Sequence, residues 1–260
     1  MRLARKLPLV VSILSILVVA VRAHADEIRV VTSGAVPAAL GELTTEFERA
    51  TKNKVVTTYG ASMGNAPDSI PNRLARGEAA DVVILAGQAL DELIAHGQVL
   101  AGSRVDLVRS SIGVAVRAGA PRPDISSVDA LRRTLVGAKS IAYSSSASGV
   151  YLSTELFPRL GIADQIMTKS RRIESEPVGA VVSRGEAELG FQQISELLPV
   201  PGIDYIGPLP PGAQRVTVFA AGVASAAKAP DAARALIAFL ASPAAAAGIR
   251  NSGLEPIESR

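Results

Sequence analysis

The sequence predicts an α/β protein built from mainly parallel sheets, and three observations support this fold class. Apolar runs rich in β-branched residues alternate with segments whose apolar residues recur at helical spacing, as in βαβ units. An N-terminal targeting segment leaves about 235 residues, enough for one large domain or two lobes. Aromatic residues are only 3% of the chain and Cys is absent, so we expect an aliphatic core without disulfides.

The first half of the chain contains three predicted strands, at residues 28–33, 54–60 and 81–86. The segments 37–51 and 88–97 are predicted helices. Pro37 suits the first position of the first helix, and Gly97 suits the end of the second.

The second half repeats the alternation. Predicted strands lie at residues 111–119 and 139–144, and predicted helices at 126–135 and 149–162. Residues 177–193 read as a helix, a glycine break and a strand. A proline break interrupts the helical stretch 229–257.

Extended segments near residues 107–117 and 214–224 are candidates for two crossings between two lobes. They predict a lobe I at residues 26–110, a lobe II at 111–224 and a return to lobe I at 225–260.

The first 25 residues read as a secretory signal peptide. Arg2, Arg5 and Lys6 precede an apolar run at 7–20, and small residues flank His24 before Asp26. The run is shorter than the roughly 20 residues of a membrane span, although an uncleaved anchor is the alternative. We therefore expect a periplasmic protein that is not embedded in the membrane after cleavage.

Charge and composition exclude some classes of function. Without residues 1–25 the formal charge falls from +3 to −1, which gives no basic excess for nucleic acid. The mature chain keeps one histidine, His96, and no cysteine, so no metal site is expected. A serine hydrolase is disfavoured because the serines lack the G-x-S-x-G pattern and an obvious base.

Three turns rich in small and hydroxyl-bearing residues follow predicted strands. The turn "YSSSASGVYL" contains Ser146, Ser148 and Gly149, and similar turns lie at 32–37 and 60–65. A strand end that leads into a helix leaves backbone N–H groups free for an anion, and ligands of open α/β sheets bind at such ends. The turns predict an anion site, with simple helix capping as the alternative for each.

Other polar residues have weaker signals. Arg172 is a candidate for fixing a carboxylate, and Gln192 and Gln193 end a predicted strand, although both segments also read as solvated surface. If the protein moves a proton on its ligand, the candidate general bases are Tyr143, Tyr151, Glu174 and Glu176, and no spacing identifies one of them.

With these turns in place, the whole mature chain resembles the periplasmic molybdate-binding proteins of ABC transporters, which are type II solute-binding proteins. The resemblance lies in "VTSGAVPAALGELTTEFE", "RLARGEAADVVILAGQALDELIAHGQV", "SGVYLSTEL", "VSRGEAELGFQQISEL" and the closing "ALIAFLASPAAAAGI". It implies two α/β lobes, each a mainly parallel sheet flanked by helices, that close on an anion about two hinge crossings.

The resemblance also implies ligand contacts at Ala35 with Ser33, at Ser62 and Met63, and at Ser148, Val178 and Gln193. With their neighbours in the turns, the candidate binding residues are Ser33, Gly34, Ala35, Ser62, Met63, Ser146, Ser148, Gly149, Tyr151, Arg172, Val178, Gln192 and Gln193.

The chain departs from the family at two of these contacts, because Ala35 stands for a serine and Gln193 for a tyrosine. These changes favour an organic anion over tetrahedral molybdate. The expected function is a monomeric solute-binding protein for a small anion, with an ABC permease as the implied partner and no cofactor. The alternative is a cofactor-free tricarboxylate isomerase, because the chain is also similar to the aconitate isomerase branch of this family.

Overall fold

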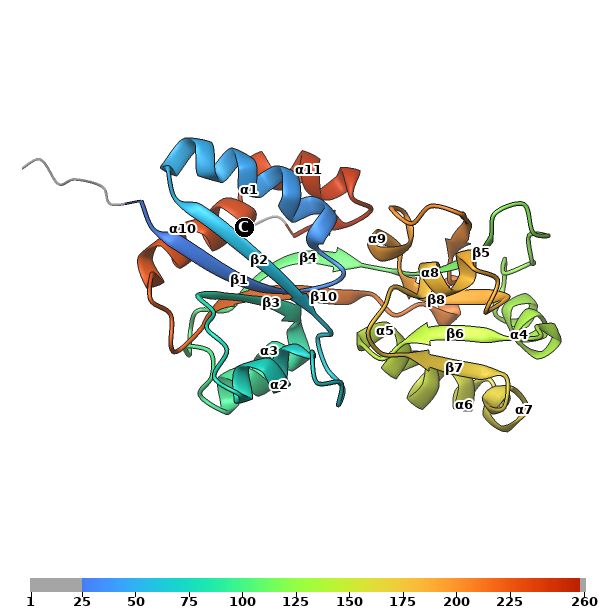
Figure 1. Cartoon of the computed structure of the whole chain (residues 1–260). Helices are drawn as coiled ribbons and strands as arrows, with labels where there is room; N and C mark the ends of the chain where they lie inside the picture. Colours follow the sequence, from blue (N-terminus) through green and yellow to red (C-terminus); the bar gives the residue numbers. More distant parts are fainter. Residues whose placement is uncertain (1–24, 258–260) are drawn as a thin grey trace, which may run out of the picture.

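The structure is a computed structural model that describes residues 25–257. It contains two lobes side by side, each with its own sheet (Figure 1). The predicted signal peptide, residues 1–25, lies outside the described residues except for Ala25.

Lobe I is a six-stranded sheet with helices on both faces (Figure 1). Its order is β11-β4-β10-β3-β1-β2. The strands are β1 (Glu27–Ser33), β2 (Lys54–Gly60), β3 (Val82–Ala86), β4 (Val105–Ser110), β10 (Thr217–Val223) and β11 (Glu255–Pro256). The helices are α1 (Pro37–Thr51), α2 (Ile70–Ala75), α3 (Gly87–Ala95), α10 (Pro230–Leu240), η3 (Pro243–Ala245) and α11 (Ala246–Asn251).

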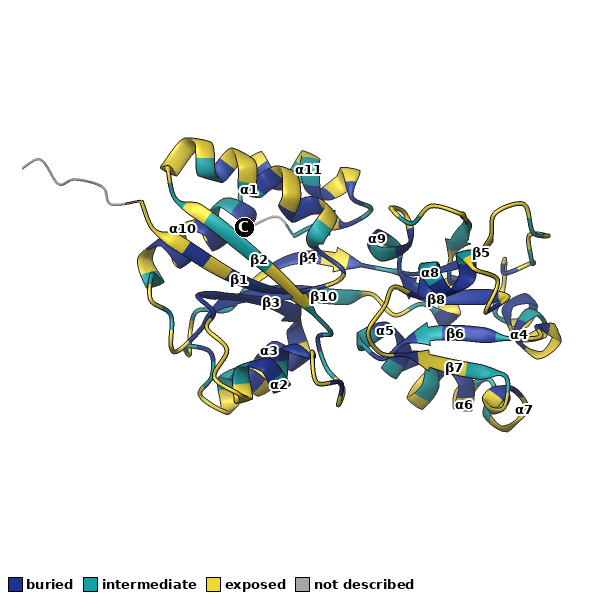
Figure 2. Ribbon diagram, in the orientation of Figure 1, coloured by how far each residue is buried: buried dark blue, intermediate teal, exposed yellow. Residues whose placement is uncertain are grey.

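Strand β3 shows why this sheet needs helices on both faces. All its residues are buried, and alternate side chains point to opposite faces. Ile84 packs in the cluster that contains Leu40 and Phe47 of α1, whereas Leu85 packs in the cluster that contains Leu90 of α3. The buried strands therefore run through the centre of the lobe, with exposed helix faces outside (Figure 2).

Lobe II has a five-stranded sheet in the order β7-β6-β8-β5-β9. The strands are β5 (Ile112–Arg117), β6 (Ile141–Ser144), β7 (Ser170–Ile173), β8 (Leu189–Gln193) and β9 (Ile203–Pro208). The helices are α4 (Val128–Gly137), α5 (Ala147–Tyr151), the π-helical η1 (Leu152–Leu156), α6 (Phe157–Arg159), α7 (Ala163–Met167), α8 (Val178–Ser183), α9 (Ile194–Leu197) and η2 (Pro211–Ala213).

Both sheets are mixed. β1 pairs in parallel with β2 and β3, and β6 pairs in parallel with β7 and β8. β10 is antiparallel to β3 and β4, and β5 is antiparallel to β8 and β9. The two-lobed α/β architecture predicted from the sequence is confirmed, whereas the prediction of mainly parallel sheets is corrected, because β10 and β5 run antiparallel to both of their neighbours.

Two short segments connect the lobes. The first is Ser111, between β4 and β5, and the second is residues 214–216, between η2 and β10. The Gln214 side chain ties the two together, because its Oε1 accepts from Ile112 N at 2.9 Å and its Nε2 donates to Ile112 O at 2.9 Å. The predicted end of lobe II at residue 224 is corrected: Thr217–Val223 pair with β3 and β4 and so belong to the sheet of lobe I.

Within residues 25–257 no single helix is long and apolar enough to cross a membrane. The bent pair Pro230–Leu240 and Pro243–Asn251 reaches that length and composition only together, across a 58° bend.

Candidate functional site

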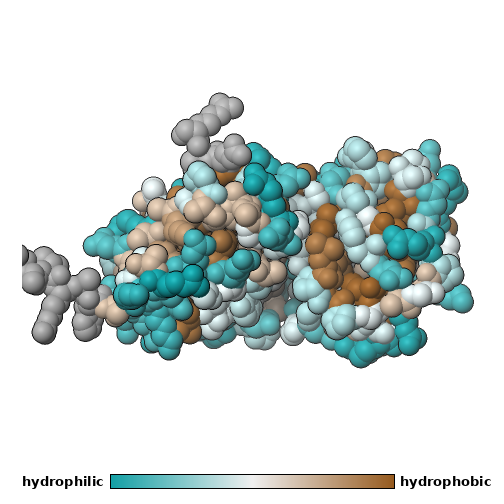
Figure 3. Space-filling view, turned by 90° about the horizontal axis from the view of Figure 1, so that it is seen from above, coloured by the Kyte–Doolittle hydropathy of each residue, from teal (hydrophilic) through white to brown (hydrophobic). Residues whose placement is uncertain are grey.

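A cavity of about 420 Å³ lies between the lobes and is called the larger cavity below. Lobe I contributes Gly34, the end of β2 and Asp68. Lobe II contributes the serine turn Ser144–Ser146, the loop before α8, Gln192 and the start of α9. The space-filling view shows the furrow where the lobes meet, with hydrophobic side chains on the lobe II side (Figure 3).

A second cavity of about 220 Å³, the smaller cavity, also lies between the lobes. It is lined by Met63, Ala86–Gln88 and the start of β10 from lobe I, by Tyr151 and Glu155 from lobe II, and by Arg215 and Val216 from the second crossing. The guanidinium of Arg215 lies 4.5 Å from the centre of the Tyr151 ring and forms an ion pair with Glu155.

The serine turns predicted from the sequence meet across the lobes. Ser62 N donates to Ser146 Oγ at 3.1 Å, and Ser62 Oγ accepts from Ala86 N at 3.0 Å. Because Ser146 Oγ only accepts in this contact, its own proton is free to donate. The link joins the turn after β2 to the turn after β6.

The other turn residues are held by their own segments. Ser33 Oγ accepts from Ala35 N at 3.3 Å, and Ala35 is buried in the core of lobe I. Ser148 Oγ and Ser144 Oγ are 3.0 Å apart. A Cβ on Gly149 would lie 1.6 Å from the Ser144 carbonyl oxygen, so only glycine fits where α5 meets the end of β6.

The candidates outside these turns fall into different surroundings. Tyr151 is buried, donates to Ala213 O at 2.9 Å and accepts from Arg159 Nη2 at 3.1 Å. Arg172 is exposed, pairs with Glu174 and is absent from the lining of both cavities. Gln193 is buried and donates to Thr217 Oγ1 at 3.2 Å.

Val178 and Gln192 are directly connected. Gln192 lines the larger cavity, and its Oε1 accepts from Val178 N at 2.9 Å. The structure thus brings Gly34, Ser146 and Gln192 to the larger cavity, and Met63 and Tyr151 to the smaller one.

The sequence pattern did not point to Glu196, a carboxyl that lines the larger cavity. This residue of α9 is partly buried and faces lobe I, where its Oε1 lies 3.1 Å from the position that a Cβ on Gly34 would take. Burial raises the pKa of Glu196 to about 7, and a hydrogen bond from the Gln192 side chain opposes that rise. Glu196 can therefore accept or donate a proton near neutral pH.

Ser195, the neighbour of Glu196, was also missed. It lines the larger cavity, and its buried Oγ has no hydrogen-bond partner among the described residues. The signal for both residues is their position directly after β8, because the ends of strands in α/β sheets face ligands.

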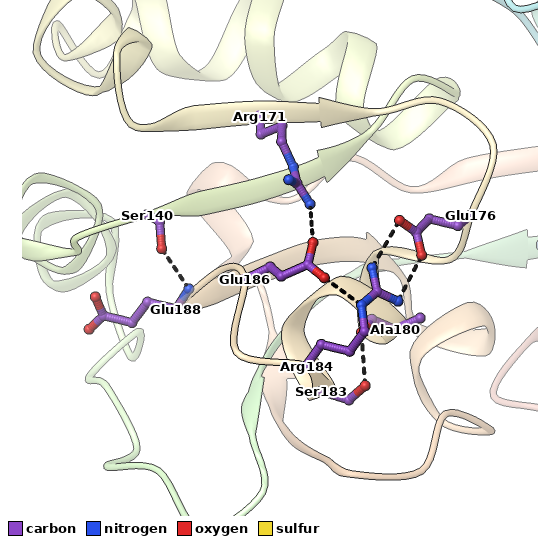
Figure 4. A network of polar contacts seen from close by, with 8 residues as sticks. All are labelled: Ser140, Arg171, Glu176, Ala180, Ser183, Arg184, Glu186 and Glu188. Carbon is purple, nitrogen blue, oxygen red and sulfur yellow. Dashed lines mark hydrogen bonds and ion pairs between the residues drawn. The ribbon is translucent and has the colours of Figure 1, made fainter.

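The other two glutamates on the lobe II side of the larger cavity are in ion pairs. Glu174 pairs with Arg172, and Glu176 accepts two hydrogen bonds from Arg184, at 2.9 and 3.0 Å. Arg184 and Arg171 also hold Glu186, and this lowers the pKa of Glu186 to about 2 (Figure 4). The network fixes the loop before α8 at the edge of the cavity.

The remaining candidate base, Tyr143, packs edge-on against Phe157, with 5.9 Å between the ring centres. Among residues 25–257 no three His, Cys, Asp or Glu side chains form a group that could hold a metal ion.

Comparisons with known proteins agree with the fold. A model of bacterial extracellular solute-binding proteins matches residues 28–255. An aconitate isomerase from a Pseudomonas species is 52% identical over 231 residues, which cover 89% of this chain and 88% of that protein.

Solved structures match at lower identity. The periplasmic molybdate-binding protein of Azotobacter vinelandii has a TM-score of 0.70 and 21% identity, over 90% of this chain and all of that one. A sulfate-binding protein of Mycobacterium tuberculosis H37Rv has a TM-score of 0.67 and 19% identity, over 90% of this chain and 88% of that one. These structures share the two-lobed fold. The resemblance inferred from the sequence is confirmed for the family and the fold.

Proposed function

The chain belongs to the family of bacterial extracellular solute-binding proteins, and we propose that its cleft holds a tricarboxylate and interconverts the isomers of aconitate through Glu196. The observation that carries the proposal is the Glu196 carboxyl, which is partly buried between the lobes and has a pKa of about 7. A protein that only binds and releases an anion has no use for such a proton acceptor. The relative at 52% identity supports the same choice.

The proposed reaction is an allylic proton shift. The carboxylate form of Glu196 takes a proton from the methylene carbon of aconitate, and the C–H electrons form a new double bond to the central carbon. The electrons of the old double bond then take the same proton back from Glu196 at the far carbon. Substrate and product have the same atoms and charge, and Glu196 returns to its starting state.

Negative charge develops on the substrate carboxylates during this shift. Hydroxyl and backbone donors that already point into the cleft would stabilise it, because they need no reorganisation in the transition state. Ser146 has a proton free to donate, and the buried Ser195 hydroxyl has no described partner.

The first experiment combines a thermal-shift assay with NMR detection of turnover. cis-Aconitate and trans-aconitate at about 100 times their Kd should add roughly 2.7 kcal/mol to the free energy of unfolding and raise Tm by about 5–10 °C. Molybdate and sulfate form the comparison panel. ¹H NMR of the same samples should show conversion between the two aconitates.

The variant Glu196→Gln should keep the thermal shift and lose turnover by about 10²–10⁴-fold, because it keeps the shape of the side chain and loses the proton acceptor. The matched control is Glu174→Gln, which changes a paired carboxylate of the same cavity and should keep turnover. Loss of turnover in the control instead would remove the assignment to Glu196.

A binding-only protein gives a different pattern. Stabilisation by aconitate without conversion would contradict the isomerase proposal. It would support the alternative, a solute-binding component of an importer with an ABC permease as partner. Stabilisation by the oxyanions alone would reject the tricarboxylate as well. The N-terminal signal pattern supports a periplasmic location for either function.

A further inference from the structure

We propose that the smaller cavity is a carboxylate-binding pocket and that Arg215 is the cation that holds the carboxylate. The inference rests on the proposed function only for the source of that group, which is either one end of the tricarboxylate or a separate small carboxylate. Arg215 has no part in the proposed proton shift, which takes place at Glu196 in the larger cavity.

The two cavities differ in charge. Four carboxyl side chains line the larger cavity, and none of the described residues that line it is Lys or Arg. Ion pairs neutralise two of these carboxyls, Glu174 and Glu176, but add no cation to the lining. The smaller cavity is lined by two arginines, Arg104 and Arg215, and by one carboxylate, Glu155. Because an anion that leaves water needs a positive partner, the smaller cavity is the better place for a carboxylate.

The guanidinium of Arg215 is held on the wall of the smaller cavity and keeps donors to spare. Its Cζ lies 4.5 Å from the centre of the Tyr151 ring, and its Nη2 donates to Glu155. Nε and Nη1 have no hydrogen-bond acceptor among residues 25–257, and 48% of the side chain is exposed. A guanidinium has several N–H donors in a planar fork that matches a carboxylate. Arg215 can therefore bind a second carboxylate beside Glu155.

Lobe I adds another cation and backbone donors to the same cavity. Arg104 donates from Nη1 to Gly87 O at 3.2 Å, and its ion pairs with Asp91 and Asp106 hold the guanidinium in place. A Cβ on Gly87 would lie 2.8 Å from Arg104 Nη2, so residue 87 must stay small for the guanidinium to lie there. Gly87 and Gln88 line the cavity and begin α3, which has no side-chain cap. Their N–H groups have no partner within the helix, which also suits an anion.

The smaller cavity is next to the larger one. Ala61 and Ser146 line the larger cavity, whereas Met63 and Ala147 line the smaller one. The hydrogen bond from Ser62 N to Ser146 Oγ, at 3.1 Å, lies between these two sets of residues. The volume of about 220 Å³ is below the roughly 300–1,000 Å³ of pockets for larger ligands. The pocket therefore suits the end of a longer acid or a whole small one.

Two substitutions separate a carboxylate anchor from a structural ion pair. The probes are tricarballylate, which is a tricarboxylate without a double bond, and acetate. Arg215→Met removes the cation and should raise the Kd of the carboxylate that occupies the pocket by about 10–100-fold. Glu155→Gln removes the competing carboxylate, so the Kd should stay the same or fall. An ion pair with only a structural role would instead make both substitutions weaken binding equally.

Isothermal titration calorimetry measures both ligands, with acetate also added to protein saturated with tricarballylate. Binding of acetate to the saturated protein that depends on Arg215 identifies a separate small carboxylate. A tricarballylate Kd that depends on Arg215 identifies one end of the tricarboxylate. Arg234→Met, at an exposed arginine of α10 paired with Asp231, is the matched control and should leave every Kd unchanged. Arg215→Lys, which keeps the charge and loses the planar fork, should weaken binding less and replaces Arg215→Met if that variant does not fold.

A raised Kd in Arg215→Met, with an unchanged or lower Kd in Glu155→Gln, supports the inference even if no aconitate is converted and the proposed isomerase fails. Parent values for both ligands in a folded Arg215→Met protein, or equal weakening in both variants, overturn it and leave the isomerase proposal in place. A parent protein that binds neither ligand also overturns it. In the turnover assay, an end of the tricarboxylate held by Arg215 should appear as a raised KM with kcat within a few-fold of the parent, because Glu196 is untouched.

Discussion

At the scale of single residues, the cleft holds carboxyls in two environments. Glu174 and Glu176 lie on an exposed loop and form ion pairs with arginines. Burial raises the pKa of Glu196, and a hydrogen bond from the Gln192 side chain opposes that rise. The environment, and not the residue type, makes Glu196 the candidate proton acceptor.

The raised pKa of Glu196 predicts a pH-dependent cost to stability. Between its unfolded pKa of 4.5 and its folded pKa of about 7, the folded protein binds more protons than the unfolded chain, so the free energy of unfolding falls as pH rises. Glu196→Gln should therefore be more stable than the parent at pH 8, by on the order of 2–3 kcal/mol.

Urea denaturation at pH 4.5 and at pH 8 checks this prediction. The two proteins should have similar stability at the lower pH, where the carboxyl is protonated in the folded protein and about half protonated in the unfolded chain. A difference that is larger at pH 4.5 than at pH 8 would contradict the burial of Glu196.

Individual site residues were predicted where the backbone turn itself is the signal. The serine and glycine turns could be recognised because three of them follow predicted strands, although helix capping is an alternative for each one. Glu196 could not, since "ISEL" reads as an ordinary helix start and the raised pKa comes from the packing of lobe I over it. The exposure of Arg172 could not be predicted either, because it follows from the place of Arg172 on the edge strand β7.

At the scale of elements, the long apolar strands and helices were predicted well. The predicted segments 37–51 and 54–60 coincide with α1 and β2. The sequence predicts no strand at the short edge strand β7, because its segment SRRI carries charges that remain exposed at the sheet edge. Such a strand is held by pairing with β6 and has no apolar pattern to reveal it.

Asp81 connects three elements of lobe I. Its carboxylate accepts from Arg29 N on β1 at 2.8 Å, and from Lys228 N and Ala229 N before α10 at 2.6 and 3.0 Å. Asp81, which ends the sequence "AAD" at residues 79–81, is thus a buried acceptor that fixes β1 and α10 to the start of β3.

Asp81→Ala should lower the free energy of unfolding by about 2–4 kcal/mol, because buried backbone donors lose their partner. At this chain length Tm should fall by roughly 5–15 °C. Differential scanning calorimetry measures the change. Asp129→Ala, in the exposed first turn of α4, is the control and should change stability by less than about 1 kcal/mol. Equal effects of both substitutions would refute this role of Asp81.

At the scale of the whole molecule, the Gln214 amide connects the two crossings that form the hinge. It holds both backbone groups of Ile112, so the two crossings move together. Gln214→Leu should loosen the lobes and increase the radius of gyration of the ligand-free protein in small-angle X-ray scattering. Far-UV circular dichroism should show that both lobes remain folded. An unchanged radius of gyration would contradict the role of Gln214 in holding the two crossings together.

The order of strands in lobe I has a consequence for how the protein is made. Lobe II is one continuous stretch of chain inserted between β4 and β10, whereas β10 is the middle strand that joins β3 to β4. During synthesis from the N-terminus, lobe II can therefore be complete while β3 and β4 still have open edges. Those edges are sites for wrong pairing with other chains, so the half-made lobe I is the species that a chaperone would have to protect.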